Sequence, residues 1–207
     1  MDHGKTSIRK KRAVETKKKI YKTAEQLFKQ YGFENVSVDS IVDTAGLSKG
    51  AFYVHFKSKD ALTADLINDY VNKLDFDYKS FMESFHDNTA APEILNSFIE
   101  RIAHVITCRI GFEHIKTVYK VQITKTVNTA SVLDYNRELY RIFCQIIRRG
   151  VEQGEFAAEI PVDTLAKHCV MAIRGLTYEW CIRYPDFDLK AQALRHFEIL
   201  MEGIKKR

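Results

Sequence analysis

The chain has 207 residues, of which 45% are hydrophobic and 29% are charged, and its formal net charge is +5. These proportions are those of a folded globular protein, and they exclude intrinsic disorder over most of the length. The longest apolar runs have about five residues, whereas a membrane-spanning helix needs about 18, and the basic N-terminus contains no apolar stretch of signal-peptide length. We therefore expect no membrane segment and a cytoplasmic protein.

The positive charge is concentrated at the N-terminus. Residues 1–60 contain 13 Lys or Arg against 7 Asp or Glu, whereas residues 61–207 contain 19 against 20. A basic segment of this kind is typical of an arm that faces a polyanion, and the alternative is a solvated tail without a specific partner. We expect residues 1–13 to form a flexible basic arm.

Amphipathic helices are predicted along most of the chain, because apolar residues recur at steps of three and four and only three prolines interrupt them. A first helix ends at Gly32, a residue that readily adopts the left-handed conformation found past helix ends. Ser37, Ser48 and Ser58 each precede a further helix, where a serine hydroxyl can cap free backbone N–H groups. The helix that begins at Ser58 is expected to end near Ser80.

Longer helices are predicted in the second part of the chain. They are a helix of roughly 15 residues after Pro92, and helices from about Phe112 to Lys125, from Leu133 to Gly154, from Pro161 to Pro185 and from Leu189 to Ile204. With the first four, this gives about nine helices and no strand. The sequence therefore predicts an all-α fold.

The segment from Val38 to Phe56 has the pattern helix, tight turn, helix, with a glycine in the turn. Two short helices that cross around such a turn form a helix-turn-helix, whose second helix can enter the major groove of DNA. The residues expected to form the small core that fixes this crossing are Ile41, Ala45, Leu47, Phe52 and Phe56.

A dense pattern of residues extends from Ile20 to Leu66. It consists of Ala24, Leu27-Phe28, Gly32-Phe33, Ser37-Val38, Ile41, Ala45-Gly46-Leu47-Ser48-Lys49-Gly50, Phe52-Tyr53, His55-Phe56 and Ser58-Lys59-Asp60-Ala61-Leu62. This pattern resembles the N-terminal domain of TetR-family transcriptional regulators. The resemblance implies a homodimer that binds a palindromic DNA operator through residues 14–60, and whose residues 61–207 bind a small effector and form the dimer.

The resemblance also implies roles for single residues. Ser37, Tyr53, His55 and Lys59 would contact phosphates, and Lys49 and Ala51 would face base edges. A lysine can donate to guanine O6 and N7, while an alanine offers only apolar contact, for example with a thymine methyl. The full set of DNA-binding residues implied in this way is Ser37, Ser48, Lys49, Gly50, Ala51, Tyr53, Val54, His55 and Lys59.

Two departures from the family pattern concern direct base readout. Many relatives carry an alanine at position 42 and a hydroxyl residue at position 51, whereas this chain has Val42 and Ala51. Hydrogen-bond readout by the second helix is therefore expected to be sparse. The alternative for single residues is a structural role, in which Tyr53 covers the core, His55 is buried by its neighbours and Lys49 is a solvated charge.

Residues 61–207 are rich in aromatic side chains, and small-molecule pockets are usually lined by apolar and aromatic groups. We expect an uncharged, apolar or aromatic effector that releases the protein from its operator. The aromatic residues predicted to contact it are Phe81, Phe85, Phe98, Phe112, Tyr119, Phe143 and Tyr178. The alternative is that these side chains form an ordinary core.

The last two helices carry long apolar stripes that can pair with the same helices of a second protomer. The residues predicted for this dimer interface are Ile173, Leu176, Trp180, Phe197, Leu200 and Ile204. Gly175 lies within the first stripe and would permit close approach of the two helices.

No cofactor and no metal site are predicted. The four cysteines form no C-x-x-C pair, and His104 and Cys108 alone do not complete a zinc site. No hydrolase, metalloprotease, dinucleotide or phosphate-loop motif occurs, so an enzyme is not expected. The remaining alternative is a nucleoid-associated or architectural DNA-binding dimer that senses no ligand.

Overall fold

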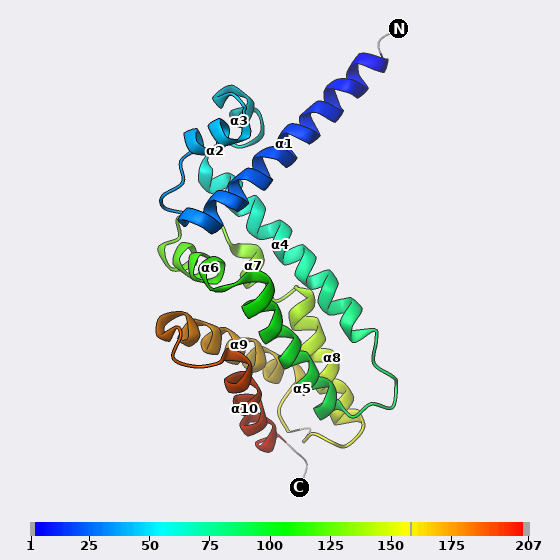
Figure 1. Ribbon diagram of the computed structural model, residues 1–207. Helices are drawn as coiled ribbons and strands as arrows, with labels where there is room; N and C mark the ends of the chain where they lie inside the picture. The colour runs from blue at the N-terminus through cyan, green and yellow to red at the C-terminus, as the bar shows by residue number, and fades with distance from the viewer. Residues whose placement is uncertain (1–2, 158, 205–207) are drawn as a thin grey trace. The chain divides into compact units, whose positions relative to one another are not determined.

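A computed structural model describes residues 3–157 and 159–204 of the protein, and residues 3–9 by their backbone alone (Figure 1). These residues form helices joined by turns, and no strand occurs among them. The helices are α1 (His3–Tyr31), α2 (Val38–Ala45), α3 (Lys49–His55), α4 (Lys59–Met82), α5 (Ala91–His104), the π-helix η1 (Val105–Ile110), α6 (Phe112–Thr124), α7 (Ala130–Leu133), α8 (Glu138–Glu152), α9 (Val162–Arg183) and α10 (Leu189–Glu202). The predicted all-α fold is confirmed.

The chain divides into two compact units, which we call the first unit and the second unit. The first unit extends to Asp69 and also includes Thr117–Thr129, and the second consists of Tyr70–Lys116 and the chain from Ala130 onward. Helices α4 and α6 each contribute residues to both units. This division differs from the predicted boundary after residue 60, because a segment distant in sequence completes the first unit.

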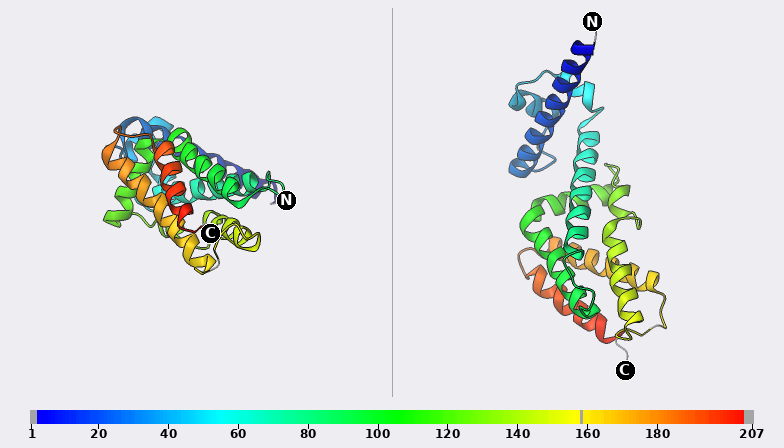
Figure 2. Two further views of the ribbon diagram at one scale, coloured as in Figure 1. Left: turned by 90° about the horizontal axis from the view of Figure 1, so that it is seen from below. Right: turned by 90° about the vertical axis from the view of Figure 1, so that its right-hand side faces the viewer.

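The core of the first unit is formed by apolar faces of α1, α2, α3 and the start of α4. Helices α2 and α3 lie beside α1 (Figures 1 and 2). Apolar side chains from all four helices pack together there, and the buried members of this cluster are Ile20, Ala24, Leu27, Val36, Ile41, Val42, Phe52, Phe56 and Leu62. Removing such a set from water supplies the main stabilisation of so small a unit.

A second, smaller core in the first unit involves α6. Phe33, in the turn after α1, is buried together with Val121 and Val127. An ion pair between Lys120 and Glu34, with 2.9 Å between nitrogen and oxygen, lies at the surface of the same region. The segment Thr117–Thr129 therefore completes the apolar cover of Phe33.

Helix α1 extends further toward the N-terminus than the sequence predicted. It begins at His3, so that the segment expected to be a flexible arm is helical from His3 onward, while residues 1 and 2 lie outside the described residues. The helix ends at Gly32, which has a φ of 76° and donates its N–H to the carbonyl of Phe28 at 3.0 Å. This positive φ is the conformation for which glycine was expected there.

The second unit is built around a column of aromatic rings. Helix α5 packs against α8 and α10, and α9 packs against the same two helices (Figures 1 and 2). Tyr78 of α4, Phe98 of α5, Phe143 of α8 and Phe197 of α10 follow one another at centroid distances of 5.5, 5.3 and 6.2 Å. Each of these rings is at most 3% exposed, so the column fills the interior of the unit.

Two aspartates of α4 hold the neighbouring helices. Asp75 accepts hydrogen bonds from Arg137 at 2.7 Å and from the backbone N–H of Glu138 at 3.3 Å. Asp77 pairs with Arg101 of α5 at 2.7 Å and with Arg109 of η1 at 3.2 Å. Charge-assisted bonds of this kind fix orientation as well as contributing energy.

Two predicted helices differ in the structure. The helix expected from Leu133 is interrupted: Asp134 accepts the N–H of Asn136 at 2.8 Å, which forms a local turn, and α8 begins only at Glu138. The helix after Pro92 changes from α to π geometry at Val105, and Gly111 then donates its N–H to the carbonyl of Ile106 at 2.9 Å.

Candidate nucleic-acid interface and effector pocket

Local capping positions the two helices of the helix-turn-helix. The hydroxyl of Ser37 accepts the N–H of Ser40 at 3.0 Å, and the hydroxyl of Ser48 accepts the N–H of Ala51 at 3.1 Å. Between the helices, Gly46 adopts a φ of 59°, and the N–H of Leu47 bonds to the carbonyl of Val42 at 2.9 Å. These bonds satisfy the free backbone groups at the helix ends and fix the turn.

The predicted core of the helix-turn-helix is confirmed by burial. Ile41 and Phe52 are fully buried, Ala45 and Phe56 are nearly so, and Leu47 packs against the same cluster while remaining half-buried. Because Phe52 and Phe56 anchor one face of α3 and the segment after it, the opposite face of α3 is presented to solvent.

The side chains predicted to face DNA lie on this opposite face. Val54 is 79% exposed and Tyr53 is 55% exposed, and the side chain of Lys49 is 61% exposed. Gly50 is exposed, while Ala51 and His55 are half-buried. An ammonium group, a phenol and two apolar side chains can therefore meet a groove together, which suits both phosphate contact and base-edge contact.

Lys49 has a partner that the sequence analysis did not identify. Its ammonium lies 2.8 Å from a carboxylate oxygen of Asp39, at the start of α2. Hydrogen bonding to this carboxylate raises the pKa of Lys49, so the side chain stays charged at neutral pH. Asp39 therefore orients the one lysine of α3. Its place in the first turn of α2, two residues after a capping serine, is a signal that could have been used.

Lys59 is placed differently from the prediction. Its ammonium donates to the carbonyl oxygens of Phe33 and Val36, both at 2.9 Å, and it lies 4.2 Å from the centroid of the Phe33 ring. Two of its three donors are thus engaged within the chain. In this structure Lys59 ties α4 to the turn before α2, and we revise its predicted role from phosphate contact to structural support.

The basic residues of α1 are mostly on its surface. Lys17 is half-buried and lies 3.3 Å from Asp65, which also accepts the hydroxyl of Tyr21 at 3.0 Å. The exposed cations of α1 from Lys10 onward are Lys10, Lys11, Arg12, Lys18, Lys19, Lys22 and Lys29. A helix that carries this charge can contribute sequence-independent affinity for a polyanion.

The residues predicted for the dimer interface divide into two sets. Ile173, Trp180 and Phe197 are at most 5% exposed within the single chain, because they pack into the interior of the second unit. Leu176 and Ile204 are half-buried, and Leu200 is exposed.

The outer sides of α9 and α10 carry other apolar residues instead. The exposed apolar residues are Met171, Tyr178 and Ile182 of α9 and Ile199 and Leu200 of α10, which we call the outer stripe. Gly175 belongs to the same face of α9, where a Cβ would meet nothing within 4 Å.

The aromatic residues predicted to contact a ligand are mostly engaged with each other. Phe98 and Phe143 belong to the buried column, and Phe112 stacks on Tyr184 with ring centroids 4.1 Å apart. Phe81 and Phe85 form an edge-to-face pair at 5.2 Å. Tyr119 belongs to the segment of α6 in the first unit, and Tyr178 lies on the outer stripe.

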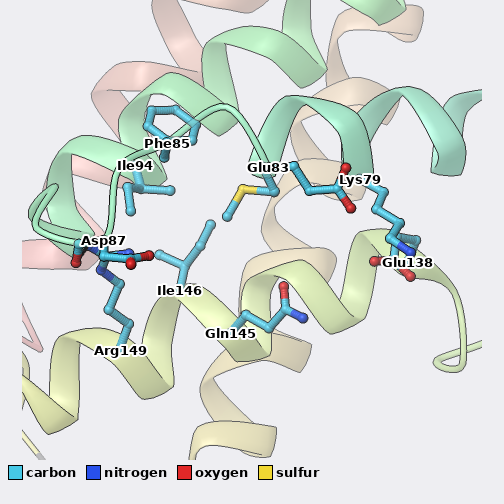
Figure 3. A pocket seen from close by; sticks show the side chains of 10 residues that line it. Lys79, Glu83, Phe85, Asp87, Ile94, Glu138, Gln145, Ile146 and Arg149 are labelled. Atoms are coloured by element: carbon cyan, nitrogen blue, oxygen red, sulfur yellow. Dashed lines mark hydrogen bonds between the residues drawn. The ribbon is translucent and has the colours of Figure 1, made fainter.

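A pocket of about 440 Å³ lies in the second unit, between the end of α4, the turn that follows it, α5 and α8. It is lined by Lys79, Met82, Glu83, Phe85, Asp87, Ile94, Glu138, Gln145, Ile146 and Arg149. Figure 3 shows Asp87 and Arg149 at one end and Lys79 and Glu138 at the other, with Ile146 between them. Of the aromatic residues predicted for a ligand site, Phe85 alone is among the lining residues.

The charged lining of this pocket was missed by the sequence analysis. Lys79 and Glu83 are one helical turn apart on α4, and Glu138, Gln145 and Arg149 recur at steps of seven and four along one face of α8. That spacing was available in the sequence. It was passed over because only apolar and aromatic residues were considered as ligand contacts.

Further searches address the other predictions. Within residues 3–157 and 159–204, no group of His, Cys, Asp and Glu side chains is arranged to hold a metal ion. Among the same residues, no helix is both long enough and apolar enough to cross a membrane.

Comparison with known proteins identifies the family. The profile of the family described as "Bacterial regulatory proteins, tetR family" matches residues 20–66. The HTH-type transcriptional regulator AcrR of Shigella flexneri is 25% identical over 203 residues, which cover 93% of this chain and 91% of AcrR. The HTH-type transcriptional repressor KstR2 of Mycobacterium tuberculosis (strain H37Rv) is 24% identical over 197 residues, which cover 90% of this chain and 92% of KstR2.

Solved structures share the fold over nearly the whole chain. A TetR-family transcriptional regulator from Pectobacterium atrosepticum has a TM-score of 0.75 at 18% identity, covering 95% of this chain and 97% of that one. Thermus thermophilus FadR, solved in complex with lauroyl-CoA, has a TM-score of 0.68 at 17% identity, covering 92% and 96%. The helix-turn-helix, the helical second unit and these relatives lead to one conclusion: the chain belongs to the TetR family of DNA-binding transcriptional regulators.

Proposed function

We propose that the protein is a transcriptional repressor that binds a palindromic operator as a homodimer and leaves it when a small effector binds the second unit. The observation that carries the proposal is the exposed face of α3, where Lys49, Tyr53 and Val54 project from a helix anchored by Phe52. A repressor role is in keeping with the related KstR2, which is named a repressor.

The homodimer is proposed to form through the outer stripe. Its residues on α9 lie at steps of seven and four, so that they share one side of the helix, and Gly175 on that side leaves room for a partner helix. Two recognition helices must lie about 34 Å apart, or a multiple of that distance, to enter successive major grooves on one side of DNA. A symmetric dimer meets this requirement on a palindrome.

The effector is proposed to act by changing the separation of the two recognition helices. Helices α4 and α6 contribute residues to both units, and are therefore the segments through which a ligand in the second unit can affect the first. A ligand that prefers the state with the wrong spacing lowers operator affinity by its differential affinity for the two states. A regulator of this fold is known with lauroyl-CoA bound, namely Thermus thermophilus FadR.

Selection from random DNA duplexes tests the proposal. The purified protein should enrich one palindromic sequence and bind it with an affinity about a thousandfold or more above that for unrelated DNA, as specific regulators do. Enrichment of no sequence would instead support the alternative function, a nucleoid-associated or architectural protein. That alternative is favoured by one observation, the sequence-independent charge along α1.

A further inference from the structure

We propose that the pocket of the second unit binds an amphiphile with a single cationic head group and a short apolar body. The inference rests on the proposed function, since it names the class of effector that the repressor would sense. It revises the uncharged effector expected from the aromatic content of the sequence. The argument depends on which charges line the pocket and on how each of them is already engaged.

The apolar part of the pocket is formed where α5 and α8 face each other. Ile94 and Ile146 are each 1% exposed, and Met82 and Phe85 are half-buried beside them. These four side chains offer a hydrocarbon surface, and the volume of about 440 Å³ lies in the range of small-molecule pockets, which is about 300 to 1,000 Å³. A short alkyl chain or a single ring therefore matches this part of the site.

The charges around the apolar part are unbalanced. Three carboxylates and two cations line the pocket, which leaves a formal excess of one negative charge: Glu83, Asp87 and Glu138 against Lys79 and Arg149. One singly charged cation would bring the lining to neutrality. An anion would double the excess in a partly enclosed site, where like charges are more costly than in bulk water.

The engagement of each charged group favours a cation further. Arg149 directs its Nη2 to the backbone carbonyls of His86 and Asp87, so its charge is already used to hold the turn after α4. Within the described part of the chain, no cation pairs with the carboxylates of Glu83 and Asp87. Glu138 has only Arg141, at 3.9 Å.

The two unpaired carboxylates lie on the same wall of the pocket, at the end of α4 and in the turn after it. Figure 3 shows the carboxylate of Glu83 above Ile146, with the amide of Gln145 across the pocket from it. A primary ammonium can donate to carboxylate oxygens and to an amide oxygen at once. Its alkyl chain would then extend along Ile94 and Ile146.

The test compares three probes that share an eight-carbon chain and differ in the head group: octylammonium, octanoate and 1-octanol. Isothermal titration of the full-length protein should give an affinity for octylammonium about tenfold above that for the other two, as expected for charge-assisted contacts. Octanoate binding as tightly as octylammonium would overturn the proposal. So would an absence of heat from all three probes.

Variants locate the head group. Glu83→Gln and Asp87→Asn keep the shape of each side chain, and the double variant should lower the affinity for octylammonium about tenfold while leaving that for 1-octanol unchanged. Glu152→Gln is the matched control, because Glu152 is an exposed carboxylate of α8 outside the pocket lining. An unchanged affinity for octylammonium in the double variant would refute the assignment of these carboxylates.

The effector role is measured separately on the complex with DNA. Octylammonium should release the protein from its selected operator, and the double variant should need about tenfold more of it. Binding of octylammonium without release would disprove the effector role alone. A protein that binds no operator even without ligand would disprove the proposed function, while the titration would still report on the pocket.

Discussion

The two units present their binding groups in opposite ways. In the first unit, Lys49, Tyr53 and Val54 project outward from a helix whose other face is anchored in a closed core. In the second unit, the candidate binding groups line a recess between helices that are distant in sequence. A projecting surface requires only one short, well-anchored helix. A recess requires several helices to be held apart at fixed positions.

This difference has consequences for rigidity. The recognition surface depends on local bonds, such as the capping of α2 and α3 by Ser37 and Ser48, which reform whenever the helices do. The recess depends on long-range ties, among them the bond between Arg149 and the turn after α4. We therefore expect the first unit to keep its shape on binding and the second to adjust.

Independent cores would show most clearly that the two units are separate. Phe52→Ala should remove about 3 to 5 kcal/mol from the stability of the first unit, because the ring is fully buried. Phe143→Ala should have a similar effect on the second unit. Amide hydrogen exchange is expected to report lost protection in residues 20–66 for the first variant and in α5, α8 and α10 for the second. Loss in both regions from either variant would mean that the chain unfolds as one unit.

The dimer can be broken without disturbing either core. Ile182→Asp places a charge in the centre of the proposed interface and should cost about 2 kcal/mol or more, which raises the dimer dissociation constant about thirtyfold. Sedimentation equilibrium measures that constant. Phe76→Asp is the control, since Phe76 is an equally isolated apolar side chain of α4, 73% exposed and outside the outer stripe. Equal weakening by both changes would contradict the interface.

The structural role of Lys59 is tested within the first unit. Lys59→Ala removes two charge-assisted hydrogen bonds to backbone carbonyls and should lower the free energy of unfolding by about 2 kcal/mol. Lys57→Ala, two residues earlier and exposed, should change it little. Thermal denaturation distinguishes the two variants. If Lys59→Ala left stability intact and lowered the salt dependence of DNA binding by about 0.9, Lys59 would be a phosphate contact after all.

Base selectivity should depend on Lys49 and its partner together. Lys49→Ala should relax the preference at one base-pair position per half-site by about tenfold, with little effect elsewhere. Asp39→Asn should relax the same position, because the lysine loses the carboxylate that orients it, while overall DNA affinity rises with the loss of a negative charge. Selection from random duplexes reads both. A change in affinity with no change in base preference would make Lys49 a phosphate contact.

The first unit was largely predictable from its sequence. The capping serines, the turn glycine and the core residues Ile41, Phe52 and Phe56 all act over a few residues, so their spacing specifies the local structure directly. Lys59 was misassigned because its partners, the carbonyls of Phe33 and Val36, are backbone groups more than twenty residues away. Such partners leave no pattern in the sequence.

The second unit was predictable only in its secondary structure. The stripes of α5, α8, α9 and α10 were recognised, but periodicity does not tell which apolar residues face the interior of one chain and which face a partner. Phe197 illustrates this, since it lies under Phe143 instead of on the outside of α10. The interruption at Asp134 and the pocket both depend on contacts between separate helices.

The discontinuous composition of the first unit bears on the biosynthesis of the protein. Phe33 is covered by Val121 and Val127, which are translated long after the helix-turn-helix itself. At about 5 to 20 residues per second, the segment that ends at Thr129 leaves the ribosome several seconds after Asp69 does. The nascent chain therefore cannot close the cover over Phe33 until much of the second unit has been made, and full DNA-binding capacity develops late in translation.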